Sequence, residues 1–294
     1  MPLSPLPTLM IEAPVRAALL EDLGHAGDLT TDAIVPASLR AETALVARQS
    51  GVVAGLDAAA LAFRLVDPAI QVRIERPDGS RVKPGDRIAT IAGPARGMLT
   101  AERVALNFLG HLSGVASATA TLVEAVRGHK ARICCTRKTM PGLRALQKYA
   151  VRAGGGVNHR FGLDDAVLIK DNHVAAAGGV AAAIRAARAG VGHLVKIEVE
   201  IDRLDQLDEA LAEKADAVLL DNMGPEMLAE AVRRIGGRAI AEASGRITPA
   251  TAPAIAASGV DLISAGWLTH SAQVLDIVLD WRWVHAKAAA LRRA

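Results

Sequence analysis

Polar and charged residues follow a series of short apolar segments in the second half of the chain, and their types could do chemistry. For example, Thr136-Arg137-Lys138 follows Ile133-Cys134-Cys135, and Lys170 follows Val167-Leu168-Ile169. If the apolar segments are parallel strands, their carboxyl ends meet on one face, where barrel enzymes place their active sites. The candidate site residues found in this way are Thr136, Arg137, Lys138, Lys170, Glu200, Asp221, Ser244, Gly245, Gly266 and His270.

The positive charges near this face predict an anionic substrate. Arg137, Lys138 and Lys170 lie at expected strand ends, and His159-Arg160 follows the glycine run 154–156. Arginine binds carboxylates and phosphates through paired hydrogen bonds, whereas lysine acts as a point charge. We therefore expect a substrate that carries several carboxylates or phosphates.

A second group of cations has two interpretations. Arg144, Lys148 and Arg152 lie about one helical turn apart, so they either share a solvated helix face or extend the anion site. The spacing favours the solvated face. The glycine run beside them allows unusual backbone dihedrals, but it matches neither a phosphate loop nor a dinucleotide fingerprint.

Two carboxylates lie among these cations. Glu200 and Asp221 end neighbouring expected strands. Bare carboxylates would repel a polyanion, so they predict contacts to sugar hydroxyls or a Mg²⁺ ion placed between them and phosphate groups. An ordinary structural ion pair is the third alternative.

The elements that must position these residues alternate regularly after residue 130. We predict strands at 132–135, 166–169, 195–199, 217–220, 239–242 and 262–264, with helices at 142–153, 175–189, 203–213, 225–235 and 249–258. Apolar strands that alternate with helices indicate a parallel sheet covered by helices, which forms a closed or an open barrel.

The first part of the chain has a different pattern. Helices are expected at 8–22 and 56–65, and strands at 43–48, 71–76 and 87–92, with tight turns between them. This pattern predicts an α+β region with an antiparallel sheet. Two further helices are expected, from Thr100 to about Gly110 and from Ser113 to Arg127, and a last helix at 271–292.

Composition excludes several classes of protein. The chain has 294 residues, of which 51% are hydrophobic and 22% charged, a balance that favours a folded protein over a disordered one. Aromatic residues make up only 2%, too few for a stacking platform for nucleic acid, and the net charge is only +3. The two cysteines, Cys134 and Cys135, are adjacent, so neither a disulfide framework nor a zinc site is expected. No membrane span or signal peptide is apparent, and we predict a cytoplasmic protein with no nucleic-acid partner.

The candidate residues belong to longer motifs in a fixed order. The central ones read TRKTMPGLR at 136–144, GGGVNHR at 154–160 and LIKDNH at 168–173. Shorter ones are EDLG at 21–24, GDLTT at 27–31, ERVALN at 102–107, LSG at 112–114, EVE at 198–200, LDN at 220–222, EASG at 242–245 and GWLTH at 266–270. The motifs occur in order from residue 21 to residue 270, so the likeness extends along nearly the whole chain, and the chain resembles the quinolinate phosphoribosyltransferase family.

The resemblance implies an architecture and a reaction. The fold would be an N-terminal α/β sandwich-like domain, residues 1–112, over an incomplete α/β barrel, residues 113–271, with a C-terminal helix, 272–294, that returns to the first domain. The enzymes of this family transfer the phosphoribosyl group of 5-phosphoribosyl 1-pyrophosphate to quinolinate, with loss of CO₂, to give nicotinate mononucleotide for NAD biosynthesis. The resemblance also implies a homodimer in which Arg103 enters the neighbouring active site.

The resemblance assigns roles to the site residues. The quinolinate pocket maps onto Arg103 of the neighbouring subunit together with Arg137, His159, Arg160 and Lys170, with Thr136 among the substrate contacts. The phosphoribosyl pyrophosphate site maps onto Lys138, Glu200, Asp221, Ser244, Gly245, Gly266 and His270. Lys138, Glu200 and Asp221 would be catalytic, and Mg²⁺ would be held through the pyrophosphate with Glu200 and Asp221 nearby.

Four positions depart from the family pattern, and two other functions stay open. Cys135 stands where Asp is usual, Gly110 where Gln is commoner, and Arg246 where a small residue is usual. Met140, in the motif KTMPG, resembles the residue at this position in molybdenum-associated relatives of the family. Arg246 would either contact phosphate or be solvated. One alternative function is phosphoribosyl transfer to another anionic heteroaromatic compound, and the other is non-catalytic binding of anions or nucleic acid.

Overall fold

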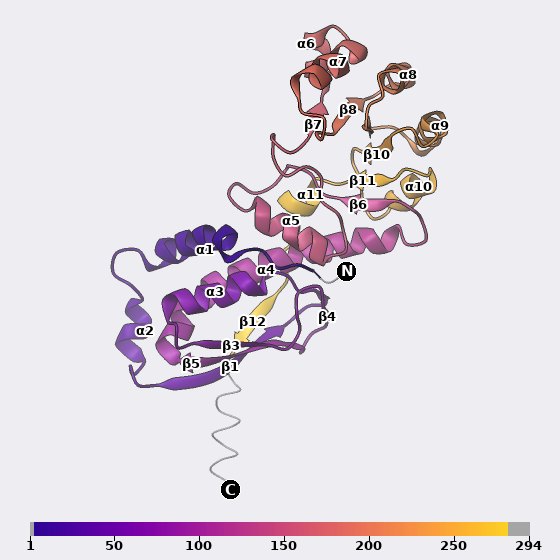
Figure 1. Ribbon diagram of the computed structural model, residues 1–294. Coiled ribbons are helices and arrows are strands. Elements are labelled where there is room, and N and C mark those ends of the chain that lie inside the picture. Colours follow the sequence, from indigo (N-terminus) through magenta and orange to yellow (C-terminus); the bar gives the residue numbers. More distant parts are fainter. Residues whose placement is uncertain (1–2, 282–294) are drawn as a thin grey trace. The chain divides into compact units, whose positions relative to one another are not determined.

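The computed structural model describes residues 3–281, and within them the chain forms two compact units (Figure 1). The first unit comprises residues 3–118, 140–155 and 271–281, and the second comprises 119–139 and 156–270. The first unit therefore collects three separate stretches of the chain. An antiparallel α+β unit and a parallel α/β unit confirm the predicted fold class.

The first unit is built on a four-stranded antiparallel sheet with the strand order β12-β1-β5-β3. The middle of both long strands is buried continuously, over Thr43–Leu45 in β1 and Ile88–Ile91 in β5, so both faces of the sheet are covered there. The strands are β1 (Arg40–Ala47), β3 (Gln71–Ile74), β5 (Arg87–Pro94) and β12 (Ile277–Asp280), with a two-stranded sheet of β2 (Gly51–Val52) and β4 (Arg81–Val82).

Five helices belong to or begin in this unit. Seven of the eleven residues of the alanine-rich α3 are buried, because small side chains let the helix pack closely on its neighbours. Helix α4 is the longest, and its final turns extend into the second unit. The helices are α1 (Thr8–Leu23), α2 (Leu29–Ile34), α3 (Leu56–Val66), α4 (Ala95–Ala125) and α5 (Arg144–Ala153).

The two helices predicted on either side of Gly110 are one continuous helix. The glycines of α4 are sites of close approach, since a Cβ on Gly110 would lie 2.9 Å from a methyl group of Val274, and one on Gly114 only 2.0 Å from the carbonyl oxygen of Gln273. Glycine here makes room for the passing chain and does not end the helix.

The predicted C-terminal helix is wrong as far as the structure describes it. Residues 277–280 form strand β12, which pairs antiparallel with β1 from Ala44↔Asp280 to Ala47↔Ile277. Segment 271–281 thus belongs to the first unit, but it completes a sheet and does not form a helix. The rest of the predicted helix, 282–294, lies outside the described residues.

The second unit is a six-stranded parallel sheet with the order β6-β11-β10-β9-β8-β7. β6 and β7 are the first two strands of this sheet along the chain, and they lie at opposite ends of the strand order. The barrel is therefore open, as the resemblance implied. The bounds are β6 (Arg132–Cys134), β7 (Val167–Ile169), β8 (Ile197–Ile201), β9 (Ala217–Asp221), β10 (Ile240–Ser244) and β11 (Leu262–Ser264).

Helices connect these strands, as expected for parallel pairing. The helix predicted at 175–189 is two helices, because Gly178 and Gly179 both have positive φ, 82° and 139°. The helices are α6 (Asp171–Ala177), α7 (Val180–Gly190), α8 (Leu204–Ala212), α9 (Pro225–Ile235), α10 (Ala252–Ala257) and α11 (Trp267–His270). None of the described helices has the length and apolar character that a membrane crossing requires.

Candidate active site

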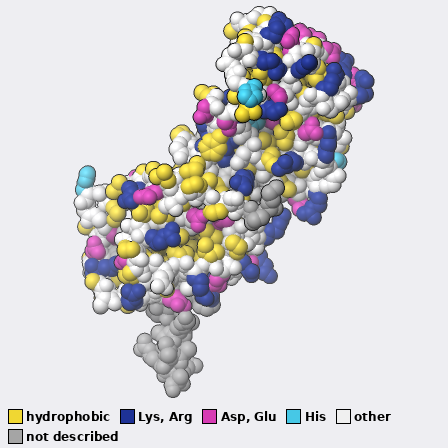
Figure 2. All heavy atoms as spheres, viewed as in Figure 1, with side chains coloured by type: hydrophobic (Ala, Val, Ile, Leu, Met, Phe, Trp, Pro, Cys, Tyr) yellow, Lys and Arg dark blue, Asp and Glu magenta, His cyan; other side chains and the backbone are white. Residues whose placement is uncertain are grey.

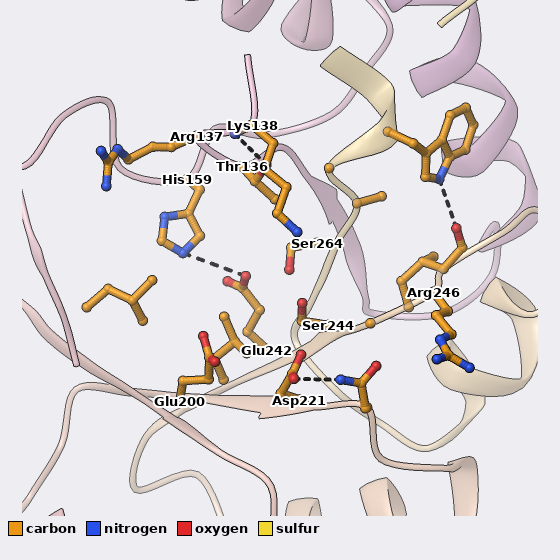
Figure 3. A pocket seen from close by; sticks show the side chains of 18 of the residues that line it. Thr136, Arg137, Lys138, His159, Glu200, Asp221, Glu242, Ser244, Arg246 and Ser264 are labelled. Carbon is orange, nitrogen blue, oxygen red and sulfur yellow. Dashed lines mark hydrogen bonds and ion pairs between the residues drawn. The ribbon is translucent and has the colours of Figure 1, made fainter. Parts of the chain in front are cut away.

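A cavity of about 680 Å³ opens in the second unit at the carboxyl ends of the parallel strands (Figure 3). Every strand of the sheet except β6 contributes a residue of its own or its direct successor, and the loop after β6 contributes 136–138. Of the candidate residues, the structure brings together Thr136, Arg137, Lys138, His159, Arg160, Lys170, Glu200, Asp221, Ser244, Gly245, Gly266 and His270. This is the convergence that the placement of polar residues after apolar segments predicted.

Strand register explains why these side chains meet. Ser244 of β10 pairs with Asp221 of β9 on one side and with Ser264 of β11 on the other. Because side chains alternate along a strand, residues two positions earlier lie on the same side of the sheet, at a deeper level. Glu198, two residues before Glu200, and Glu242, two residues before Ser244, therefore lie beneath the rim.

The two deep glutamates hold His159 between them. The Nε2 atom of His159 lies 2.9 Å from Oε2 of Glu198 and 3.7 Å from Oε1 of Glu242. Side-chain exposure is 11% for His159, 11% for Glu198 and 2% for Glu242, so the cluster is shielded from solvent. Figure 3 shows the imidazole directed toward Glu242.

The hydrogen bonds of His159 fix its tautomer. The backbone N–H of Arg160 donates to Nδ1 at 2.7 Å, which makes Nδ1 an acceptor and leaves the proton of the neutral ring on Nε2. Nε2 then donates to Glu198. His159, Glu198 and Glu242 have ligand atoms within 4.8 Å of one another, a spacing at which a metal could bind, but a protonated Nε2 offers no lone pair.

Burial changes the charge state of Glu242. Removal from water, reinforced by the nearby Glu198, raises the pKa of Glu242 to about 7, although His159 and the Ser264 hydroxyl act in the opposite direction. A carboxyl group with this pKa is partly protonated at neutral pH. The cluster therefore carries less negative charge than two ordinary glutamates would.

Arg137 and Arg160 line the cavity next to this cluster. The Nε atoms of both arginines are buried without a hydrogen-bond partner among the described residues, while Nη1 of Arg160 donates to the carbonyl oxygen of Ala166 at 3.0 Å. Desolvation and the charge of Arg137 lower the pKa of Arg160. Two adjacent, partly desolvated guanidinium groups with unused donors suit a ligand with two carboxylates.

The opposite wall carries the two rim carboxylates. Lys170 Nζ lies 3.3 Å from Oε2 of Glu200, and the Asn222 side chain donates to Oδ2 of Asp221 at 2.6 Å. Carboxylate oxygens are the ligands that Mg²⁺ prefers, and Mg²⁺ commonly uses one or two of them together with substrate phosphates. Glu200 and Asp221 therefore fit such an ion.

Glycine and threonine hold Lys138 in the cavity wall. Its backbone N–H donates to Oγ1 of Thr136 at 3.0 Å, and its carbonyl oxygen accepts a hydrogen bond from Thr269 at 2.7 Å. A Cβ on Gly266 would lie 2.8 Å from Cδ of Lys138. Glycine at 266 is therefore the residue that lets the lysine side chain pass.

Other candidates lie elsewhere. The second group of cations does not line this cavity: Arg152 is exposed, whereas Lys148 has 0% exposure, so the prediction of a shared solvated face is wrong for Lys148. Its neighbours Gln147 and Tyr149 are also buried, which shows that this stretch of α5 faces the core. The glycine run 154–156 does not line the cavity either.

Arg103 is in the first unit, on α4. It lines a separate hollow of about 300 Å³ together with Asp22, Asp28 and Thr100. Arg103 does not line the cavity of its own chain, so a role in the site of a neighbouring subunit stays a prediction.

The structure adds site residues that the sequence interpretation missed. Glu198 and Glu242 are the most consequential of them, and the two-residue period of a strand could have found both, because each precedes a candidate residue by two positions. Glu242 lines the cavity, whereas Glu198 supports it through His159; further lining residues are Leu168, Leu219, Asn222, Ile247, Ser264, Ala265 and Trp267. Cys135 is buried and does not line it; its thiol donates to Oδ1 of Asn158 at 3.4 Å, next to His159.

An open α/β barrel whose basic cavity is also walled by carboxylates defines an enzyme that acts on small polyanions. Two family models match the chain, "Quinolinate phosphoribosyl transferase, N-terminal domain" over residues 28–113 and its C-terminal domain over residues 115–280. The chain belongs to the quinolinate phosphoribosyl transferase family.

Curated proteins and solved structures agree with this membership. The chain is 49% identical over 273 residues to the nicotinate-nucleotide pyrophosphorylase (carboxylating) of Mycobacterium leprae, which covers 90% of this chain and 95% of the relative. It is 40% identical to the chloroplastic enzyme of that name from Arabidopsis thaliana, over 93% of this chain and 83% of the relative. The structure of NadC from Streptococcus pyogenes, 43% identical, matches with a TM-score of 0.91 and covers 94% of this chain and 98% of its own.

Proposed function

We propose that this chain transfers the phosphoribosyl group of 5-phosphoribosyl 1-pyrophosphate to quinolinate and releases CO₂ and pyrophosphate, giving nicotinate mononucleotide for NAD biosynthesis. The observation that carries the proposal is the pair Arg137 and Arg160, whose buried Nε atoms find no hydrogen-bond partner within residues 3–281, in a cavity that also presents carboxylates. Quinolinate has two neighbouring carboxylates, which match two neighbouring guanidinium groups. The names of the relatives support the same reaction.

In this proposal, Arg137, Arg160 and Lys170 bind the two carboxylates of quinolinate, with Thr136 nearby. His159 anchors Arg160 through its backbone N–H, while Glu198 and Glu242 hold the imidazole. The cation pair orients the pyridine ring so that its nitrogen faces the anomeric carbon, which is catalysis by positioning.

The phosphoribosyl group would occupy the rest of the cavity. Glu200 and Asp221 accept hydrogen bonds from ribose hydroxyls or hold Mg²⁺, and Ser244, Gly245, Gly266 and His270 contact phosphate. When bound there, Mg²⁺ would neutralise charge on the departing pyrophosphate. Lys138 stabilises the same developing charge, which is the largest kind of contribution that a preorganised site makes.

The reaction would proceed by phosphoribosyl transfer followed by decarboxylation. The ring nitrogen forms a bond to the anomeric carbon as the bond to pyrophosphate breaks. The cationic ring then takes up the electron pair of the adjacent carbon–carboxylate bond, CO₂ leaves, and a proton from solvent completes the product. Loss of charge is favoured in a site from which water is excluded. No protein nucleophile takes part.

The test is a coupled product assay. Purified protein with quinolinate, phosphoribosyl pyrophosphate and Mg²⁺ is expected to form nicotinate mononucleotide and CO₂ in equal amounts. Omission of Mg²⁺ is expected to abolish turnover. If folded protein consumes phosphoribosyl pyrophosphate only with another heteroaromatic acid, or not at all, the proposal is wrong.

The proposal includes a homodimer in which Arg103 completes the neighbouring quinolinate site. Support comes from exposed apolar side chains on α1 and α2, including Leu9, Leu20, Leu29 and Ile34 at 63–87% exposure, beside the hollow that contains Arg103. Figure 2 shows apolar side chains gathered over α1. Such patches mark protein contacts more often than free surface.

Mixing two inactive variants tests this arrangement. Arg103→Ala and Lys138→Ala are each expected to be inactive, whereas mixed dimers have one intact site and regain activity. If the mixed variants exchange subunits and still show no activity, Arg103 acts in its own subunit's site or in no site. The cytoplasmic location stays a prediction from the sequence.

A further inference from the structure

Arg246 is a cation in the cavity wall without an assigned task. It follows Ser244-Gly245 at the end of β10, lines the cavity and is exposed. Within residues 3–281 its side chain makes neither a hydrogen bond nor an ion pair, in contrast to Lys170, which is paired with Glu200. An unpaired guanidinium at a cavity wall is free to bind an anionic ligand.

The backbone at this position is unusual for arginine. Its φ is 49°, in the left-handed region, and that of Gly245 is 105°. A side chain at Gly245 would collide with Asn222, since a Cβ there would lie 2.3 Å from Oδ1. Left-handed backbone is costly for a residue such as arginine and inexpensive for glycine or asparagine.

The same turn presents unused backbone donors. In the part of the chain that the structure describes, the N–H groups of Gly245, Arg246 and Ile247 have no hydrogen-bond acceptor. Successive N–H groups in a turn with left-handed residues form a concave site that binds anions. Backbone donors and a guanidinium thus coincide at one place on the cavity rim.

This place lies away from the dicarboxylate end, which we define as Arg137, His159 and Arg160. Figure 3 shows Arg246 on the opposite side of the cavity from Arg137, His159 and Glu200, with Ser244 and Ser264 between them. The rim carboxylates that suit Mg²⁺ and a pyrophosphate are Glu200 and Asp221. With quinolinate at the dicarboxylate end, the group that extends farthest from it is the phosphate on C5 of the ribose.

We propose that the side chain of Arg246 binds the 5′-phosphate of phosphoribosyl pyrophosphate and contributes to the affinity for this substrate. The inference rests on the proposed function for the identity of the ligand. Arg246 with the N–H groups of residues 245–247 forms what we call the phosphate end of the cavity. The guanidinium adds charge-assisted hydrogen bonds to contacts that the backbone makes with any residue at this position.

The experiment uses two probes that each carry one of the phosphate groups. Ribose 5-phosphate has only the 5′-phosphate, and inorganic pyrophosphate has only the leaving group. Their affinities for full-length protein with Mg²⁺ are measured by calorimetry, alongside the KM values for both substrates. The variants are Arg246→Asn, which accepts left-handed backbone without charge, and Arg246→Lys, which keeps a point charge.

For Arg246→Asn we expect ribose 5-phosphate to bind about tenfold more weakly and KM for phosphoribosyl pyrophosphate to rise by about the same factor. KM for quinolinate and affinity for pyrophosphate should stay within about twofold. Arg246→Lys should recover part of the loss, because the charge remains but the paired geometry does not. Unchanged ribose 5-phosphate binding, or a loss confined to pyrophosphate, overturns the inference.

A matched control separates this effect from folding and from net charge. Lys214 is also an exposed cation in the left-handed region, with φ 56°, but it lies before β9 and does not line the cavity. Both Arg246→Asn and Lys214→Asn should keep or raise the melting temperature, because asparagine relieves the backbone strain. Only Arg246→Asn should change KM; an equal change in Lys214→Asn contradicts the inference.

Failure of the inference can be told from failure of the proposed function. If the wild type forms nicotinate mononucleotide and Arg246→Asn matches it in every constant, the function stands and the inference falls. If the wild type gives no product but its ribose 5-phosphate affinity depends on Arg246, the phosphate site stands and the proposed acceptor is wrong.

Discussion

The two ends of the cavity hold positive charge in different ways. At the dicarboxylate end, guanidinium groups are half-buried above a cluster of His159, Glu198 and Glu242 that is almost closed to solvent. At the phosphate end, Arg246 is exposed and its neighbours offer backbone N–H groups. The first end depends on side chains that support one another, and the second depends on a turn.

This difference predicts different kinds of selectivity. A desolvated cation pair left without its ligand is costly, so the dicarboxylate end should reject compounds that lack one carboxylate, such as nicotinate. At the phosphate end the ligand would stay in partial contact with water, so each charge contributes less to the binding free energy. Substitutions should therefore have larger effects at the first end than at the second.

The largest effect is expected for Arg137→Ala. Truncating one partner of a desolvated ion pair costs about 3 kcal/mol, so kcat/KM for quinolinate should fall roughly a hundredfold or more. Steady-state kinetics at saturating phosphoribosyl pyrophosphate measure this. Arg132→Ala is the matched control, since Arg132 is exposed at the other end of the same strand region. A loss below about threefold for Arg137→Ala would contradict the comparison.

A smaller effect is expected on stability for Glu242→Gln. The pKa of Glu242 is raised from a usual 4.5 to about 7, so folding favours the protonated form. This contribution to the free energy of unfolding is complete below pH 4.5 and is lost as the pH rises through 7. The nearby Glu198, His159 and Ser264 also act on this carboxyl group, so the cost of ionising it above pH 7 is shared with them.

Urea unfolding at about pH 5 and about pH 8 measures this difference. Glutamine imitates the protonated acid, so Glu242→Gln should be stabilised relative to the wild type at the higher pH and little changed at the lower. Glu226→Gln, an exposed position on α9, is the control and should leave the pH dependence intact. Parallel pH curves for the wild type and Glu242→Gln would mean that Glu242 is ionised like an ordinary surface acid.

The smallest effect is expected from salt. Mobile ions screen exposed charges more than buried ones. Between about 50 and about 500 mM potassium chloride, KM for phosphoribosyl pyrophosphate should rise about threefold, whereas KM for quinolinate should change less than twofold. Arg246→Asn should reduce the first rise. Equal salt dependence for both substrates would remove the distinction between the two ends.

Much of the second unit could be predicted because its strands are short, mostly apolar runs and its helices follow with regular spacing. The prediction was wrong where tertiary partners decide the local structure. Segment 277–280 is a strand because β1 pairs with it, and Gly110 makes room for Val274 and does not mark the end of a helix. Neither partner is near in sequence, so local patterns carry no sign of it.

The candidate site was predicted well at the rim and poorly beneath it. Residues that directly follow strands, such as Lys170 and Ser244, stand out as polar after apolar runs. Glu242 lies inside its strand, where a charged residue reads as an interruption unless strand alternation is applied. Lys148 shows the converse limit, since helical spacing alone did not indicate that its face of α5 is buried.

The pairing of β1 with β12 has a consequence for biosynthesis. Thr43 donates its hydroxyl to the carbonyl oxygen of Asp280 across a separation of 237 residues. At a synthesis rate of roughly 5–20 residues per second, the ribosome needs roughly 10–50 seconds to make the partner of β1 after β1 itself. During that interval one edge of the first sheet is open to the wrong partners, and a chain that stops before Ile277 never closes it. The pairing of β12 is thus the step at which the first sheet gains its fourth strand.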